Sequence, residues 1–227
     1  NGGFTSESGR LVSVNKGGWD KSEGVEEDFK FHKKWISECR RLLKPDGTIW
    51  LSGTYHNIYK CGYALELEGF HILNEIAWYK PKSADNISGR MFKAQHESLI
   101  WAKKEKIAKH KFSYEYLKKT DWGQDFLKKQ GEQMGSVWAI HAPGLIERKF
   151  GKHPTQKPQE LLKRIILSCT RKGDSILDPF CGSGTTGVVA SLYGRSFVGI
   201  DSDPKYLEMA QSRFTELKRV AAQTSYL

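Results

Sequence analysis

Residues 174–204 read DSILDPFCGSGTTGVVASLYGRSFVGIDSDP, and this stretch decides the fold. Its pattern predicts a strand that ends at Asp178, a glycine-rich turn, a helix, a second strand that ends at Asp201 and a final helix. Strands that alternate with helices are typical of a parallel, doubly wound α/β sheet. We therefore expect a Rossmann-like α/β fold with a mostly parallel sheet.

The glycine-rich turn is expected to bind a nucleoside. Gly182 and Gly184 allow the backbone to turn tightly and to approach a ligand with no side chain in the way. Asp201 stands at the end of the next strand, where an acidic side chain accepts hydrogen bonds from ribose hydroxyls. No lysine follows the glycines, which excludes a phosphate-binding Walker loop.

The late position of this unit separates two classes of ligand. A dinucleotide-binding fold usually opens with such a unit, whereas few residues follow Asp201 here, so the rest of the sheet must come from upstream. Ligands of these sheets bind at the switch point between the two halves, so GKHPTQKPQELL at 151–162 should also line the site. This order favours S-adenosylmethionine over NAD(H), and an NAD-binding oxidoreductase is the alternative.

The upstream sequence supplies further helices and strands in alternation. Apolar residues at near-helical spacing predict helices at 26–43 and 56–70, and short apolar runs predict strands at 48–53 and 71–80. This alternation of helices and strands is interrupted after residue 80 and resumes with a helix at about 158–171.

The positive charge of the chain points to a polyanionic partner. The formal net charge is +10, and residues 80–119 hold eleven Lys or Arg against four Asp or Glu. Aromatic residues are interleaved with these charges, which is typical of nucleic-acid binding, although a lysine-rich surface with ordinary core aromatics is the other interpretation. We predict one domain over 1–227, with a basic target-recognition segment at about 81–150.

Other classes of protein find no support in the sequence. No run of about 18 apolar residues is present to span a bilayer, and the N-terminal NGGFTSESGR lacks the apolar core of a signal peptide. We expect a soluble, cytoplasmic protein without a membrane partner. The four cysteines lie far apart with no CxxC spacing, so neither a disulfide framework nor a metal site is predicted.

Several motifs together resemble one enzyme family. These motifs are LKPDGTIWLSGTYHNIY (43–59), NEIAWYKP (74–81), HPTQKP (153–158), LDPFCGSGTTGVVA (177–190) and FVGIDSDPKYLEMAQSRF (197–214). Over nearly the whole chain they resemble the β-class DNA amino-methyltransferases, above all the DpnII-type and HinfI-type adenine-N6 enzymes. The resemblance implies a permuted sheet order, S-adenosylmethionine as cofactor, and methylation of adenine N6 in DNA within a restriction-modification system.

The resemblance leaves some alternatives open. A cytosine-N4 methyltransferase shares much of the same pattern. Double-stranded DNA is the expected partner, single-stranded DNA is left open as a further substrate, and a homodimer is left open as the assembly.

The resemblance assigns cofactor contacts residue by residue. The loop around Gly182 would surround the methionine and ribose, the following helix would direct its positive end at the carboxylate, and Asp201 would hold the ribose hydroxyls. Lys157 would pair with the carboxylate, while HPTQKP would alternatively cap the next helix with Pro158 in its first turn. The implied cofactor-binding residues are His153, Thr155, Gln156, Lys157, Asp178, Pro179, Phe180, Gly182, Ser183, Gly184, Thr185, Thr186, Asp201 and Ser202.

The catalytic tetrapeptide of the family, of the type Asp-Pro-Pro-Tyr, is not in the chain. In relatives it stands shortly before the segment that resembles NGGFTS, so the catalytic residues are expected upstream of Asn1 and none is predicted within the chain. LDPF at 177–180 resembles the tetrapeptide, but the glycine loop after it marks the cofactor strand. A catalytically incomplete, DNA-binding fragment is therefore the third hypothesis.

The remaining candidates concern DNA. Basic side chains suit phosphates, and polar side chains after the strand ends suit phosphates or base edges. His56 could equally cap its helix, and Trp19, in a glycine-rich and charged loop at 14–24, could stack on DNA or pack in the core. The predicted DNA-binding residues are Tyr55, His56, Asn57, Lys80, Lys82, Ser83, Asn86, Arg90, Lys93 and Gln95.

Overall fold

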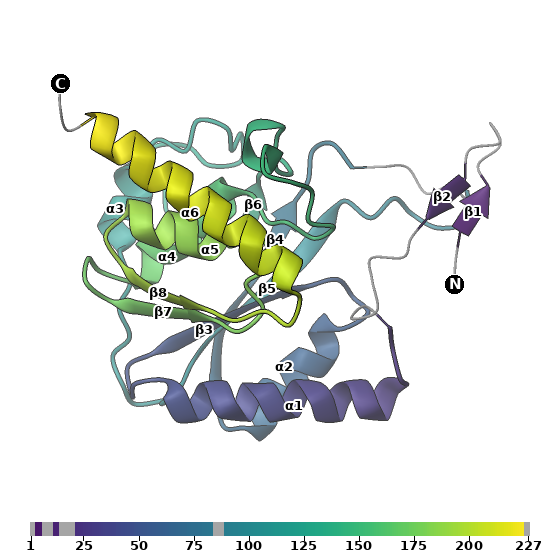
Figure 1. Cartoon of the computed structure of the whole chain (residues 1–227). Coiled ribbons are helices and arrows are strands. Elements are labelled where there is room, and N and C mark those ends of the chain that lie inside the picture. Colours follow the sequence, from purple (N-terminus) through teal and green to yellow (C-terminus); the bar gives the residue numbers. More distant parts are fainter. Residues whose placement is uncertain (1–2, 6–10, 14–20, 84–88, 225–227) are drawn as a thin grey trace. The chain divides into compact units, whose positions relative to one another are not determined.

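A computed structural model of the chain describes residues 3–5, 11–13, 21–83 and 89–224 (Figure 1). The chain divides into two compact units, of which unit 1 comprises Asn1–His110 and Gly135–Ala139, and unit 2 comprises Lys111–Met134 and Ile140–Leu227. The range 81–150 thus contributes residues to both units, and its role as one target-recognition segment of a single domain stays a prediction.

Unit 1 is built around a four-stranded sheet. Its described elements, in chain order, are β1 (Gly3–Thr5), β2 (Leu11–Ser13), α1 (Val25–Leu42), β3 (Thr48–Gly53), α2 (Ile58–Leu67), β4 (His71–Tyr79), β5 (His96–Lys103) and β6 (Val137–Ala139). The spatial order of the sheet is β3-β5-β4-β6, and β1 pairs with β2 in a separate two-stranded ribbon. The two predicted helices and two predicted strands of this region are confirmed to within a few residues.

The four-stranded sheet is mixed. β5 runs antiparallel to both β3 and β4, whereas β6 runs parallel to β4. A parallel neighbour requires a crossover connection, usually a helix, and the described residues between β4 and β5 contain none. The expected parallel pairing is therefore limited to β4 with β6 in this unit.

The register brings the carboxyl ends of β3 and β4 to the same edge of the sheet. Gly53, the last residue of β3, and Ala77 of β4 both lie opposite Ser98 of β5. The Lys80 amide donates to the Gln95 carbonyl at 2.7 Å, which continues the β4–β5 ladder beyond the strands. The segments that follow β3 and β4 therefore leave the sheet together, and we call this edge the carboxyl edge of unit 1.

Apolar side chains cover both faces of this sheet. Leu51 and Ile100 face α2 and belong to a core that also includes Ala64 of that helix. On the opposite face, Trp50 of β3 stacks on its cross-strand partner Trp101 with ring centroids 5.2 Å apart. Trp101 is thus a buried core residue, although the sequence places it among the aromatics of the basic segment.

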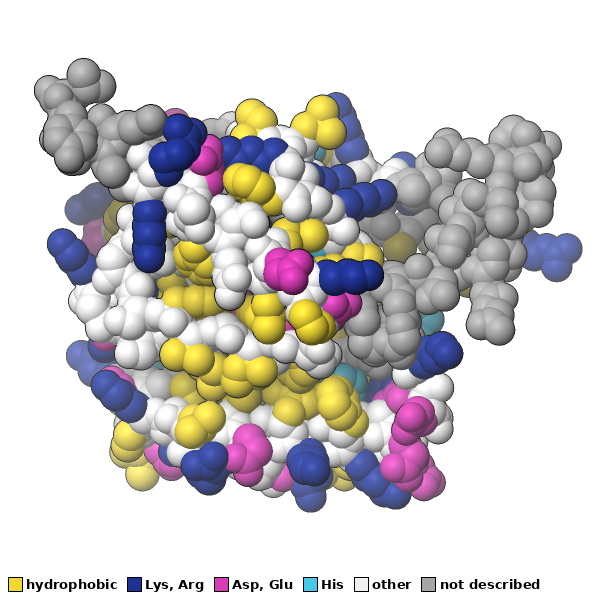
Figure 2. Space-filling model, in the orientation of Figure 1, with side chains coloured by type: hydrophobic (Ala, Val, Ile, Leu, Met, Phe, Trp, Pro, Cys, Tyr) yellow, Lys and Arg dark blue, Asp and Glu magenta, His cyan; other side chains and the backbone are white. Residues whose placement is uncertain are grey.

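Helix α1 packs beside α2 (Figure 1), and its exposed face carries charged side chains. Ion pairs join Glu27 to Lys30 and Glu38 to Arg41 along this face. Figure 2 shows the resulting alternation of dark blue and magenta side chains along the helix. Such exposed pairs contribute little to stability, so the helix is held mainly by the core beneath it.

Unit 2 contains the glycine loop. Its described elements are α3 (Tyr114–Lys119), a short 3-10 helix η2 (Ile146–Arg148), α4 (Gln159–Cys169), β7 (Ser175–Asp178), α5 (Thr185–Leu192), β8 (Ser196–Gly199) and α6 (Pro204–Thr224). β7 and β8 are parallel, with Asp178 opposite Gly199. The predicted succession of strand, glycine turn, helix and strand over 175–201 is confirmed.

A small core and one buried ion pair organise unit 2. Val189 of α5 packs with Ile166 of α4, and partly buried Phe197 of β8 lies against them. The Arg164 guanidinium donates to the Asp125 carboxylate at 2.6 Å, and both side chains are almost fully buried. Because a buried charge is tolerated only with its partner, this pair fixes the residues around Asp125 to α4.

The described part of the chain contains no helix that is long and apolar enough to cross a membrane. A cytoplasmic location stays a prediction.

Candidate functional site

The site begins where β7 ends. The Asp178 carboxylate accepts a hydrogen bond from the Phe180 amide at 3.1 Å and another from the Thr186 hydroxyl at 2.6 Å. These contacts connect the end of β7 to both sides of the glycine loop. Burial raises the pKa of the Asp178 carboxyl, an effect that the two hydrogen bonds oppose.

Asp201 closes the loop from the end of β8. One carboxylate oxygen accepts from the Gly182 amide at 2.8 Å and the other from the Asp203 amide at 2.9 Å. Each carboxylate oxygen has two lone pairs, so both keep the capacity to accept a ribose hydroxyl. The sequence predicts the ribose role and misses the second one, which is to hold the loop.

The glycines are needed where the loop is closely packed. Gly184 adopts φ +73°, and a Cβ there would lie 2.7 Å from the Ala210 Cβ. Gly182 adopts φ +48°, and a Cβ there would lie 2.9 Å from the His153 Nε2. Both the backbone conformation and the lack of space therefore exclude larger residues at these positions.

His153 lies against the glycine loop, with its Nε2 beside Gly182. Its ring contacts Tyr206 edge to face, with centroids 4.1 Å apart, and its Nδ1 accepts from the Thr155 amide at 3.2 Å. Burial lowers the pKa of the imidazole, although Asp201 acts against this shift. A neutral His153 that accepts at Nδ1 carries its proton on Nε2, the atom next to Gly182.

The HPTQKP segment is also held in place by contacts with Glu147. The Gln156 side-chain amide donates to the Glu147 carbonyl at 2.9 Å, and the Glu147 carboxylate accepts from the Gln159 amide at 2.9 Å. Gln159 is the first residue of α4, so Glu147 caps that helix from a distance. Gln156 is thus a buried structural anchor in addition to its predicted place near the cofactor.

Arg213 is a site residue that the sequence reasoning misses. This buried side chain of α6 donates from Nη1 to the Ser183 carbonyl and the Thr185 hydroxyl, both at 2.8 Å. It holds the loop at the start of α5, on the side where the helix dipole already favours an anion. Burial lowers the pKa of Arg213, which the nearby Glu147 opposes.

Most of the predicted cofactor residues therefore meet at one place in unit 2. Buried Ser183 and Thr185 belong to the loop, and Thr186 contacts Asp178. Phe180 presents a largely exposed ring beside the loop, and Ser202 is exposed next to Asp201. Pro179 and Lys157 are half-buried. The set offers glycine backbone, helix N-terminal amides and a carboxylate, which fits an amino acid joined to a nucleoside.

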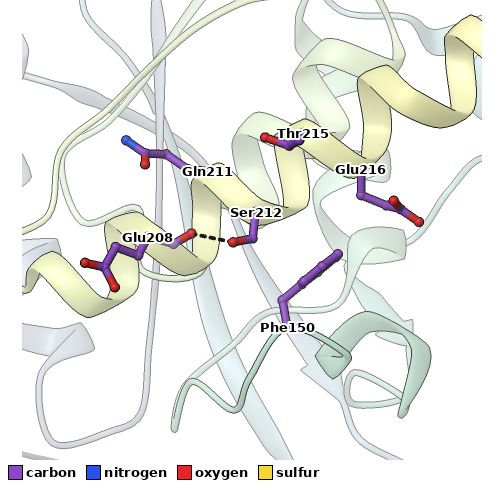
Figure 3. A pocket seen from close by; sticks show the side chains of 6 residues that line it. All are labelled: Phe150, Glu208, Gln211, Ser212, Thr215 and Glu216. Atoms are coloured by element: carbon purple, nitrogen blue, oxygen red, sulfur yellow. Dashed lines mark hydrogen bonds between the residues drawn. The ribbon is translucent and has the colours of Figure 1, made fainter.

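A separate groove lies farther along α6 and shares no residue with this set. It has a volume of about 530 Å³, and Phe150 stands opposite the α6 side chains in Figure 3. The Ser212 hydroxyl donates to the Glu208 carbonyl at 2.9 Å, so one polar group of the groove is used within the helix. Among the described residues, no group of His, Cys, Asp and Glu has the arrangement of a metal site.

The predicted DNA-binding residues follow the strands of unit 1. Tyr55, His56 and Asn57 follow β3 after one intervening residue and are all exposed, with the ring centroids of Tyr55 and His56 4.0 Å apart. Asn57 is the N-cap position of α2, but its side chain makes no capping hydrogen bond. Because β3 and β4 end at the same edge, these residues share the carboxyl edge with the segment after β4.

The basic residues after β4 differ in their surroundings. The Lys80 ammonium forms an ion pair with Glu97 and lies 4.6 Å from the centre of the Trp78 ring. Lys82 is exposed, as are Arg90 and Lys93. Gln95 and Ser83 are half-buried, and Gln95 uses its carbonyl in the sheet ladder. Asn86 and Trp19 lie outside the described residues.

The fold and the site define an α/β protein that binds a nucleoside-containing cofactor. A family described as DNA methylase matches residues 5–212. The chain is 49% identical over 214 residues to the Type II methyltransferase M2.DpnII of Streptococcus pneumoniae, which covers 94% of this chain and 77% of the relative. It is 48% identical over 217 residues to the Type II methyltransferase M2.LlaDCHI of Lactococcus lactis subsp. cremoris, covering 95% and 78%.

A solved structure shows the same fold with its cofactor. The M1.HpyAVI-SAM complex matches with a TM-score of 0.66 and 30% identity, over 84% of this chain and 85% of that chain. The chain therefore belongs to the DNA methylase family, and the predicted resemblance to DpnII-type enzymes is confirmed. It is a DNA methyltransferase of the N6 or N4 type with S-adenosylmethionine as cofactor, which overturns the alternative of an NAD-binding oxidoreductase.

Proposed function

We propose that this protein methylates the N6 amino group of adenine in DNA as the modification enzyme of a restriction-modification system. The observation that carries the proposal is the closed glycine loop of unit 2, in which Asp201 holds the Gly182 amide and keeps further acceptor capacity. Two relatives named Type II methyltransferases, each nearly half identical to the chain, support the setting. The sequences SGTYHNIY and NEIAWYKP support adenine over cytosine, because they are more similar to adenine-N6 enzymes.

The proposed division of tasks follows the two units. In unit 2, the Asp201 carboxylate would accept the ribose hydroxyls, and the amides at the start of α5 together with Lys157 would face the carboxylate of the methionine moiety. Once bound, the cofactor supplies an electrophilic methyl group on a sulfonium. Unit 1 would bind DNA at its carboxyl edge, where Lys82 and Arg90 would contact phosphates and Tyr55 would stack on a base.

The amine of the target base sets the chemical requirement. Its lone pair is delocalised into the ring, so hydrogen bonds from the amine to protein acceptors must raise the electron density on nitrogen. The base must also leave the duplex stack to reach the methyl donor. No described residue is proposed to activate the amine.

A methyl-transfer assay with the full-length gene product tests the proposal. The protein is incubated with isotopically labelled S-adenosylmethionine and DNA, and the digested nucleosides are separated by mass spectrometry. We expect label in N6-methyladenine and none in cytosine. Label only in N4-methylcytosine would contradict the choice of base and leave the cofactor site as described, whereas no label in any DNA would favour a DNA-binding module.

A further inference from the structure

An apolar tip extends from the carboxyl edge of unit 1. Phe92 has a relative exposure of 101% and Met91 one of 65%. Both lie in the segment that joins β4 to β5, at the end of the ladder where Lys80 pairs with Gln95. Single exposed apolar side chains are common on protein surfaces, whereas adjacent ones that could be buried together indicate a surface that a partner covers.

The charges around this tip restrict the kind of partner. Arg90 and Lys93 flank the two apolar residues in sequence and are exposed, and Lys82 is exposed earlier in the same segment. The partner must therefore combine an anionic outer surface with an apolar interior. Duplex DNA has this combination, because its phosphates lie outside and its stacked bases inside.

We propose that Phe92, supported by Met91, inserts into the base stack of duplex DNA and occupies space beside the base that leaves the helix. The proposal rests on the proposed function. It specifies how residues at the carboxyl edge would help the target base to leave the duplex. Removing a base from the stack costs free energy, and apolar wedges such as Phe and Met commonly open base steps. Single-stranded DNA has little stacking to open, so Phe92 is needed for the duplex alone.

The test compares two forms of one phage DNA, the single-stranded circle and the double-stranded circle, in the labelled methyl-transfer assay. The full-length protein is used unchanged and as Phe92→Ala, Phe92→Trp and Ile107→Ala. Ile107 is the matched control, because its side chain has a relative exposure of 98% but follows the opposite end of β5. None of these side chains is buried, so folding should be unaffected.

We expect Phe92→Ala to lower the rate on the double-stranded circle by about tenfold or more and to leave the single-stranded rate within about twofold. Phe92→Trp should retain most of the duplex rate, and Ile107→Ala should change neither. If Phe92→Ala lowered the rate equally on both forms of the DNA, or did not lower it on the duplex, the proposed insertion of Phe92 would be wrong. No transfer by the unchanged protein would overturn the proposed function and the wedge with it.

Discussion

In unit 2 the carboxyl ends of β7 and β8 are closed by hydrogen bonds within the chain, whereas in unit 1 the carboxyl ends of β3 and β4 lead to exposed side chains. Asp178 and Asp201 each accept two donors from the chain around the glycine loop. Tyr55 and Phe92, after β3 and β4, extend into solvent.

This difference matches the two ligands of a DNA methyltransferase. A cofactor of constant shape is bound best by a site that is already ordered, because little conformational entropy is then lost on binding. DNA is bound by charge and by side chains that adapt to its grooves and bases. The expectation is that changes in unit 2 affect stability and cofactor affinity, and changes at the carboxyl edge affect DNA alone.

The largest effect is expected from crowding the glycine loop. Gly184→Ala would place a methyl group 2.7 Å from the Ala210 Cβ at φ +73°. Strain and overpacking together should lower the free energy of unfolding by about 3 kcal/mol. Urea denaturation measures this loss.

Gly173→Ala is the matched control for this change. Gly173 has a similar φ of +87°, but a Cβ there meets nothing within 4 Å. Gly173→Ala should therefore lower the free energy of unfolding by only about 1 kcal/mol, from the strained backbone conformation alone. Equal losses in the two variants would contradict the close packing of the loop.

A smaller effect is expected at the cofactor carboxylate. Asp201→Ala leaves the Gly182 amide without its acceptor and removes the proposed partner of the ribose, so cofactor affinity should fall by roughly 1 to 3 kcal/mol. Isothermal titration calorimetry with S-adenosylmethionine measures it. Asp203→Asn keeps an oxygen for the Lys205 amide and should bind almost normally. Unchanged affinity in Asp201→Ala would remove Asp201 from the cofactor site.

The smallest effect is expected at the phosphate contacts. Lys82→Ala should reduce the slope of log affinity against log salt by about 0.9, because one phosphate contact is lost. Lys80→Ala should change the slope less, since its ammonium is already paired with Glu97 and lies over Trp78. DNA titrations at several salt concentrations measure both slopes. A larger change for Lys80 would show that the ion pair opens on DNA.

The glycine loop could be predicted from the sequence because its signals are local. A strand, two glycines and an acidic residue on the next strand lie within one short stretch, and the structure places Gly182 and Asp201 in contact. The roles that the sequence misses depend on distant contacts. In the sequence, Arg213 is one of several polar residues in a long amphipathic helix. Only the fold brings it into hydrogen-bond contact with Ser183.

The pairing of strands shows the same limit. The sequence between His96 and Lys103 is charged at both ends and follows many basic residues, so it is interpreted as part of the DNA-binding segment. In the structure it is β5, which lies between β3 and β4 and buries Trp101 against Trp50. Strand neighbours far apart in the chain leave no local pattern that could have shown this pairing.

Hydrogen–deuterium exchange with each ligand in turn tests the division of tasks most directly. S-adenosylmethionine should slow exchange of the backbone amides in residues 179–186 and 153–157, because these residues form and border the glycine loop. Exchange in residues 54–57 and 89–95 should not change. A DNA duplex added alone should slow exchange in 54–57 and 89–95. Protection of 89–95 by S-adenosylmethionine, with no change at 179–186, would contradict the assignment of the cofactor to unit 2.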